Sequence, residues 1–250
     1  MVSLIVLNSN EFVRRLKDIA INKKTFYVHG CFGAPMNAKN RQRYSNNDAF
    51  NRSRARLINE LTIDTFGFDC VCLIKGLLWG WNGDISKTYG GAVYKANGVP
   101  DVNADGMIRL CSNVSTDFKN IQVGEAVWLT GHIGVYVGDG LVVECTPKWD
   151  NKVQITALGN LGNKSGYYTR SWTKHGKLPW IDYTVSSNGT ALPKNDTVII
   201  RKYTVRKGDT LWGISTKELG KGSRYKEIME LNGLTTTFIY AGQVLKIPNK

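Results

Sequence analysis

The run of residues 123–155 constrains the fold of this chain more than any other segment. Short stretches rich in Val, Ile and Tyr alternate there with Gly and Asp turns, as in strands joined by tight connections. The predicted strands are residues 126–129, 133–137, 141–145 and 153–155. An amphipathic helix is expected earlier, at residues 11–20, because Phe12, Leu16 and Ile19 fall on one stripe. Helices followed by an antiparallel sheet predict an α+β domain.

The second and third of these strands decide where two polar residues lie. His132 opens one strand, and Glu144 lies on the next, across residues 138–140. If all three turn residues form the loop, Gly134 pairs with Glu144, and His132 and Glu144 share a face as diagonal neighbours about 7–8 Å apart. A two-residue Asp-Gly turn, which this sequence also favours, would move Glu144 to the opposite face. A His–Glu pair therefore predicts the three-residue loop.

A cysteine at the start of a buried helix is the candidate nucleophile. Asp69 suits a helix N-cap, and the apolar residues 71–79 suit a buried helix. Cys70 then lies in the first turn, where backbone N–H groups and the helix dipole are expected to favour a thiolate over a free thiol of pKa about 8.5. Cys72 should point away from Cys70 into the core. The five cysteines have neither the even count nor the density of a disulfide framework.

Three ordered blocks of this sequence resemble a known family. They are Y-V-H-G-C at residues 27–31, F-D-C-V-C-L-I at residues 68–74 and G-H-I-G-V-Y-V-G-D-G-L-V-V-E at residues 131–144. They resemble the NlpC-type cell-wall cysteine peptidases, a superfamily that includes the CHAP amidases, and the match covers residues 20–150. The resemblance implies a papain-like fold. It assigns the nucleophile to Cys70, the base to His132, the third polar residue to Glu144 and a tyrosine near the nucleophile to Tyr27.

The chemistry that this resemblance implies suits the residue types. Cys70 attacks an amide carbonyl, His132 takes the thiol proton and later protonates the leaving amine, and Glu144 orients the imidazole. The chain departs from the family at residues 71–72, where Val-Cys replaces Ser-Gly, and by an insertion at residues 34–64, which we expect to reshape the substrate groove. The reaction thus stays open between a stem-peptide bond and the bond from muramic acid to L-alanine. An inactive, wall-binding relative is the third alternative.

The last fifty residues predict a separate unit. A strand at residues 203–205, a helix at residues 211–219, a second helix ending at Asn232-Gly233 and a strand at residues 244–247 follow one another. Its expected core residues are Leu211, Ile214, Ile228 and Leu231. The βααβ order resembles a LysM module, which implies binding to N-acetylglucosamine-containing glycans of peptidoglycan or chitin. By position, the family's sugar groove falls on Gly208, Asp209, Thr210, Leu211, Ile239 and Tyr240. Residues 184–201 are the predicted linker, between a domain of residues 1–183 and one of residues 202–250.

The balance of charge favours a polyanionic partner. The chain has 33 basic and 20 acidic residues, a net charge of +13, which suits nucleic acid, anionic lipid or an anionic wall polymer. Neither a nucleic-acid-binding motif nor an apolar run of about 20 residues occurs, so we expect no nucleic acid and no membrane insertion. Residues 1–7 do not form a signal peptide. We therefore expect synthesis in a cytoplasm and release to the bacterial cell wall through a separate pore, as for a phage endolysin.

Several further motifs are expected to be structural, and no cofactor or metal is expected. With three histidines in all, zinc ligands are too few. Residues 101–112 begin like a calcium loop, but Ser112 stands where a bidentate Glu is needed, so we expect a plain polar turn. The arginines at 52, 54 and 56, on or near a predicted helix at residues 53–61, form a solvated surface or a wall-binding patch. Core positions are expected for Trp79, Trp128 and Trp212, whereas Trp149, Trp172 and Trp180 lie in loop-like sequence and are candidates for a groove.

Overall fold

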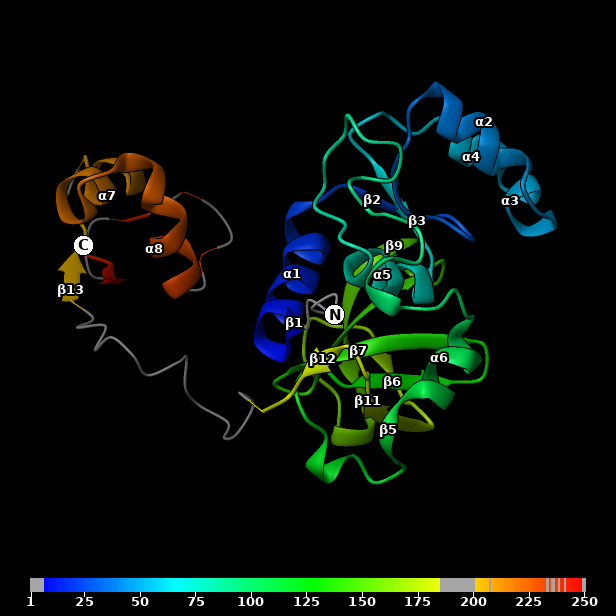
Figure 1. Ribbon diagram of the computed structural model, residues 1–250. Helices are drawn as coiled ribbons and strands as arrows, with labels where there is room; N and C mark the ends of the chain where they lie inside the picture. Colours follow the sequence, from blue (N-terminus) through cyan, green and yellow to red (C-terminus); the bar gives the residue numbers. More distant parts are fainter. Residues whose placement is uncertain are drawn as a thin grey trace. The chain divides into compact units, whose positions relative to one another are not determined.

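The computed structural model describes residues 7–184 and 201–248, the latter without residues 207, 233, 235, 236, 238 and 241. The chain divides into two compact units, residues 1–187 and 188–250 (Figure 1). The predicted linker at residues 184–201 falls mostly outside the described residues. No helix in the described part of the chain is both long and apolar enough to cross a bilayer.

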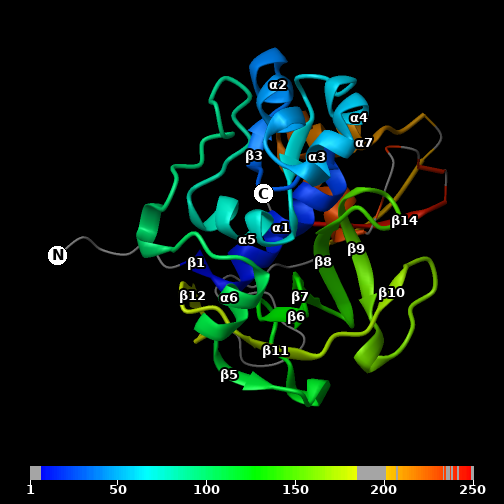
Figure 2. The same cartoon turned by 90° about the vertical axis from the view of Figure 1, so that its right-hand side faces the viewer.

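A large sheet forms one layer of the first unit. Over residues 112–177 its seven strands are β5 (Ser112–Ser115), β6 (Ala126–Leu129), β7 (His132–Gly138), β8 (Leu141–Thr146), β9 (Lys152–Leu158), β10 (Thr169–Arg170) and β11 (Lys174–Lys177). Their order is β10-β9-β8-β7-β6-β11-β5, with β10 at one edge and β5 at the other (Figure 2). All neighbours are antiparallel except β9 and β10, which are parallel. The four predicted strands are confirmed as β6, β7, β8 and β9.

The β7–β8 hairpin corrects the predicted loop. Asp139 and Gly140 form a tight two-residue turn with positive φ angles of 55° and 69°, the conformation that Asp-Gly favours. Gly134 nevertheless pairs with Glu144, because Val137 is one extra, bulged residue on β7. The pairs on either side of the bulge are Tyr136 with Val142 and Gly138 with Leu141. The three-residue loop is therefore wrong, and a β-bulge produces the predicted register instead.

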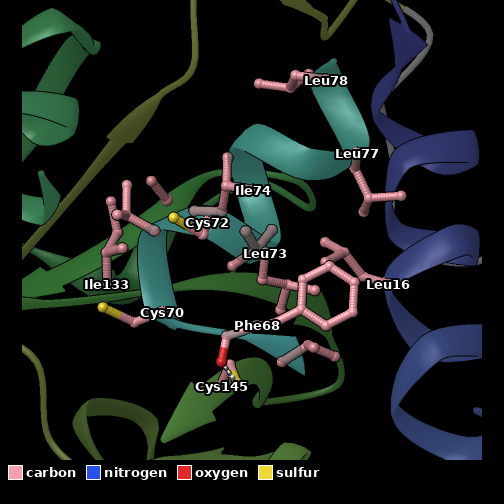
Figure 3. Close-up of a cluster of buried hydrophobic side chains, with 14 of the residues drawn as sticks. Leu16, Phe68, Cys70, Cys72, Leu73, Ile74, Leu77, Leu78, Ile133 and Cys145 are labelled. Atoms are coloured by element: carbon pink, nitrogen blue, oxygen red, sulfur yellow. Dashed lines mark hydrogen bonds between the residues drawn. The ribbon is translucent and has the colours of Figure 1, made fainter. Parts of the chain in front are cut away.

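Two helices cover one face of this sheet. In α1 (Ser9–Asn22) the predicted stripe is buried, and every residue of α5 (Cys70–Leu78) is buried. Leu16 of α1 and Leu73 of α5 (Figure 3) belong to one core. Val135 and Val143 of the sheet belong to the same core. The opposite face packs against a smaller cluster that contains Tyr136, Val142, Leu158 and Trp172. The mixed helix-and-sheet class is confirmed.

A second, three-stranded sheet leads into α5. In it β2 (Thr25–Tyr27) pairs in parallel with β4 (Phe66–Phe68), which pairs antiparallel with β3 (Phe32–Pro35). The insertion lies between β3 and β4 and forms α2 (Ala38–Asn46), α3 (Ala49–Ser53) and α4 (Ala55–Asn59). The predicted helix at residues 53–61 is wrong in extent, because the chain breaks at Arg54 between α3 and α4. The remaining short elements are β1 (Leu7–Asn8), paired with β12 (Ile181–Asp182), α6 (Ala104–Leu110) and the 3-10 turns Ala96–Gly98, Phe118–Asn120 and Gly159–Leu161.

The second unit has the predicted βααβ order. It consists of β13 (Arg201–Thr204), α7 (Leu211–Leu219), a 3-10 turn (Gly222–Arg224), α8 (Tyr225–Leu231) and β14 (Val244–Ile247), with β13 antiparallel to β14. Its buried core is Val205, Leu211, Ile214, Leu219, Ile228, Leu245 and Ile247. Leu231 is only half-buried, so its expected core position is wrong. Trp212 is also wrongly assigned: it is 57% exposed, because Leu211 and Ile214 define the buried side of α7.

Candidate active site

Asp69 fixes the start of the helix that carries Cys70. Its carboxylate accepts the N–H of Cys72 at 2.6 Å, which confirms the predicted N-cap. The same carboxylate accepts the N–H of Gly30 at 2.8 Å, in the turn after β2. Cys72 is buried in the main core, as expected. The first turn of α5 is therefore held by a buried acid on the strand side.

The sheet fixes the same turn from the other side. The Cys145 thiol on β8 donates to the carbonyl of Phe68 at 3.2 Å, two residues before Cys70 (Figure 3). The backbone N–H of Ile133 on β7 is near enough to the Cys70 sulfur to lower the pKa of that thiol. Because Ile133 follows His132 directly, α5 brings the predicted nucleophile to the start of the strand that carries the predicted base.

The Cys70 thiol is protonated at rest. Burial of the sulfur, followed by the charge of Asp69, raises the pKa of Cys70 to about 12, and the N–H groups of Ile133 and Val71 lower it only in part. The expectation that the helix start would favour a resting thiolate is wrong, since only 7% of Cys70 is exposed and desolvation outweighs the N–H groups. A nearby base must therefore take the proton as the sulfur reacts.

His132 and Glu144 form a hydrogen-bonded pair. His132 Nε2 lies 2.7 Å from Glu144 Oε2, and the Glu144 side chain is 0% exposed. A carboxylate accepts hydrogen bonds, so Nε2 carries the proton and Nδ1 is the nitrogen with a lone pair for a thiol proton. Trp172 stacks on the imidazole with centroids 5.4 Å apart and planes 12° apart. The ring is thus oriented by an acid at its edge and by an indole on its face.

Two polar partners of Glu144 escaped the sequence analysis. Thr156 on β9 donates its hydroxyl to Glu144 Oε1 at 2.7 Å, and Arg170 on β10 lies 2.9 Å from Oε2. Thr156 is a diagonal neighbour of Glu144 across β8 and β9, so the strand pattern contains a signal for it. Arg170 lies on a two-residue strand with no periodic signal. His132 and Arg170 hold the pKa of Glu144 below its ordinary value although burial opposes them.

Replacing Glu144 with glutamine will destabilise the first unit by about 3 kcal/mol at neutral pH, because it leaves the Arg170 charge without its buried anion. The folded-state pKa of Glu144 is lowered from its unfolded value of about 4.3, so the carboxylate stabilises the fold above that value and loses this effect as the pH falls through the folded-state pKa. Urea unfolding of both proteins should show a difference that shrinks on acidification. A difference independent of pH would contradict the ion pair.

Tyr27 lies near Cys70, the predicted nucleophile. Burial, followed by the charge of Cys70, raises the pKa of the Tyr27 hydroxyl, which is therefore a neutral donor. The insertion packs on this residue: the Phe50 ring lies 5.7 Å away edge to face, and Arg54 donates to the Tyr27 carbonyl at 3.0 Å. Arg54 also donates to the Asn151 side chain at 2.5 Å. Of the three expected surface arginines, Arg54 therefore has a structural role instead.

Residues 101–112 do not form the predicted polar turn, because Ala104–Leu110 of this segment are the helix α6. The oxygen atoms of the segment serve separate partners: Asp101 binds the Lys75 ammonium, Asn103 caps α6, and Asp105 accepts the N–H of Gly131 at 2.9 Å. No group of three or more His, Cys, Asp or Glu residues in the described part of the chain is arranged to hold a metal ion. Asp105 instead fixes the turn immediately before His132.

A cavity of about 670 Å³ lies next to the first turn of α5. The lining residues are His29, Gly30, Phe32, Arg43, Asp69, Val71, Cys72, Lys75, Tyr89, Tyr94, Asp101, Val102 and Asn103. Asp69, Lys75 and Asp101 give it charged groups of both signs, and Arg43 of the insertion forms part of its wall. The cavity is large enough for several residues of a peptide.

The other tryptophans of this unit divide between core and surface. Trp79 is buried in the main core, as expected, and Trp128 and Trp180 are half-buried against it. Trp149 is half-buried and stacks on Tyr168, with centroids 5.0 Å and planes 6° apart. Of the three groove candidates, Trp172 is buried and stacks on the His132 ring.

Backbone hydrogen bonds join the strand end before Gly208 to the segment after Tyr240. Val205 donates to the carbonyl of Gln243 and accepts the N–H of Gly242, both at 2.8 Å, so the segment after Tyr240 runs beside the strand end that leads to Gly208. The residues predicted to bind glycan differ in how far their side chains are exposed to solvent. Thr210 and Tyr240 are exposed, Asp209 and Ile239 are half-buried, and Leu211 is buried in the core. Leu211 can thus offer a ligand only its backbone.

Asp209 does not cap α7. Its carboxylate accepts the N–H of Arg206 and the hydroxyl of Tyr203, each at 2.8 Å, whereas Thr210 caps the helix by accepting the N–H of Gly213 at 3.0 Å. Asp209 instead closes the turn between β13 and α7.

The C-terminal unit is a LysM domain: residues 203–248 match that family. This region is also similar to curated cell-wall enzymes. It is 54% identical over 46 residues to N-acetylmuramoyl-L-alanine amidase sle1 of Staphylococcus epidermidis, and 53% identical over 45 residues to the protein of that name from Staphylococcus saprophyticus. Each alignment covers 18% of this chain and 13% of the relative, within the LysM region.

Proposed function

We propose that this protein is a cysteine-type peptidoglycan hydrolase that cuts an amide bond of the stem peptide and is held on the cell wall by its LysM domain. The observation that carries the catalytic half is the His132–Glu144 pair at 2.7 Å, at the strand start against which Cys70 packs. The LysM match and the staphylococcal relatives support wall binding. The proposed site of action is the bacterial wall.

The proposed reaction follows from which groups of the site carry a proton and which can accept one. His132 Nδ1 takes the Cys70 proton as the sulfur attacks the amide carbonyl, and Glu144 stabilises the imidazolium that forms. The proposed donors to the oxyanion are the backbone N–H groups at the start of α5 and that of Ile133. His132 then protonates the leaving amine, and a water molecule hydrolyses the thioester with the same imidazole as base.

The charged cavity beside α5 has neither Cys70 nor His132 in its lining, so in this proposal it holds a part of the peptide away from the scissile bond. Charges of both signs line it through Asp69, Lys75 and Arg43, and they suit the amine and carboxylate groups that a stem peptide bears. In the proposed reaction, the insertion at residues 34–64, which contributes Arg43 to the cavity wall, limits which amide bonds of the wall can be cut. The amidase alternative uses the same three catalytic residues and places a sugar on the other side of the scissile bond.

Digestion of purified peptidoglycan tests the proposal, with the new termini identified by mass spectrometry. New amino termini within the stem peptide are expected. Free lactyl-muramic ends together with new L-alanine amino termini would contradict the endopeptidase reaction and support the amidase reaction. Walls that gain no termini while the protein sediments with them would leave only the wall-binding function.

A further inference from the structure

Arg170 is the least expected member of the polar network around Glu144. Its Nε lies 2.9 Å from one carboxylate oxygen of Glu144 and 3.1 Å from the other, and its side chain is 14% exposed. The guanidinium lies 4.8 Å from the Trp149 ring centroid and 5.6 Å from that of Trp172. Nη2 also reaches the Thr146 hydroxyl at 3.4 Å. This side chain is held on several sides against a fully buried acid.

When a buried acid faces only an imidazole, the protonation state of the acid is coupled to that of the imidazole. Removal of a carboxylate from water favours its neutral form, and a neighbouring imidazole then gains a proton to compensate. Glu144 without Arg170 would face His132 and the neutral hydroxyl of Thr156. His132 would then hold its proton more tightly, and less of it would be in the base form that the Cys70 thiol requires.

We propose that Arg170 is a positioning residue that keeps Glu144 ionised while His132 stays neutral, so that the imidazole is ready as a base between turnovers. An arginine retains its charge at every pH at which proteins fold, so it balances Glu144 whether or not the imidazole is charged. Trp172 supports both groups, because it stacks on His132 and lies under the guanidinium of Arg170. This inference rests on the proposed hydrolase.

The ionisable groups that interact with Cys70, or are Cys70 itself, come from three elements. Asp69 and Cys70 belong to the start of α5, Tyr27 to β2 and Cys145 to β8. Burial raises the pKa of Tyr27, Cys70 and Cys145, so these three are neutral near neutral pH. Within the described residues, His132 and Arg170 are the two groups that form ion pairs with Glu144. Arg170 therefore supplies the permanent countercharge.

The test is the titration of His132 by NMR in the full-length chain, beside the pH profile of kcat/KM for a soluble muropeptide. In Arg170→Gln and Arg170→Met the pKa of His132 should rise by about one unit or more, and the acidic limb of the profile should move up by the same amount. Arg170→Lys retains the charge, so the limb should return towards its wild-type position although the rate stays lower. Lys148→Met is the matched control, because Lys148 also lies over Trp149, 4.6 Å from its ring centroid, yet is exposed.

The outcomes separate this inference from the proposed function. A uniform loss of rate in Arg170→Gln, with an unmoved His132 titration, would overturn the positioning role and leave only a structural one. An equal shift in Lys148→Met would also overturn it. If the wild-type chain cuts no muropeptide, the proposed function fails, but the NMR titration still decides whether Arg170 controls the imidazole.

Discussion

Replacing Cys70 with alanine will reduce peptidoglycan hydrolysis by at least about 1,000-fold, while the protein continues to sediment with purified walls. The sulfur is the atom that forms the thioester in the proposed reaction, and the N–H of Ile133, at the start of β7, lowers the pKa of this thiol. Alanine fits the first turn of α5 without strain, so the fold should persist. New termini released from soluble muropeptides, measured by mass spectrometry, give the rate.

Cys111→Ala is the matched control for this variant. Cys111 is another buried thiol of the same unit, and its pKa is also raised to about 12 by burial, but it lies at the end of α6. Its replacement should leave hydrolysis within about twofold, since small-volume changes in a core cost little when the fold holds. Undiminished hydrolysis by Cys70→Ala would refute the nucleophile assignment and with it the cysteine mechanism.

Removal of the LysM domain, residues 203–248, will abolish sedimentation with walls and lower the rate on intact walls by about 100-fold at dilute enzyme. Tethering raises the effective concentration of a catalytic unit at its substrate without any new contact in the active site. The two units have separate hydrophobic cores, so the first should fold without the second. The rate on soluble muropeptides should therefore be unchanged.

The net charge of +13 requires a salt control for this prediction. A basic protein binds anionic wall polymers electrostatically, and such binding weakens as the Debye length falls from about 8 Å at physiological salt. Sedimentation is therefore compared at physiological and at high salt. If the truncated chain sediments as well as the full chain at high salt, the first unit binds the wall, and the LysM domain is not what holds the protein there.

The strands, α5 and the His132–Glu144 face follow from sequence because they depend on local patterns. Alternation in residues 126–155 and the Asp69 cap are signals within a few residues of the elements that they specify. The pairing of Gly134 with Glu144 is predicted correctly, but from a three-residue loop that the structure does not have. A bulge at Val137 has no composition of its own, so alternation alone cannot distinguish it from a longer loop.

The unpredicted parts depend on contacts between distant segments. Arg170 contacts Glu144 at a sequence separation of 26 residues, and Arg54 contacts Asn151 at a separation of 97. No periodic pattern in the sequence predicts either contact. The pKa of Cys70 is also a tertiary property, because it depends on how deeply the helix start is buried. In the LysM domain, Asp209 and Thr210 are adjacent potential caps, and only the turn geometry selects Thr210.

The bulged hairpin makes chain length as important as residue identity between His132 and Glu144. Twelve positions separate the two residues, and their side chains meet because the bulge and the two-residue turn together give the required parity. Gain or loss of one residue anywhere in that interval would send the acid to the far side of the sheet and leave the histidine without its partner. Functional homologues should therefore vary this hairpin by even numbers of residues, or compensate a single-residue change with a second one nearby.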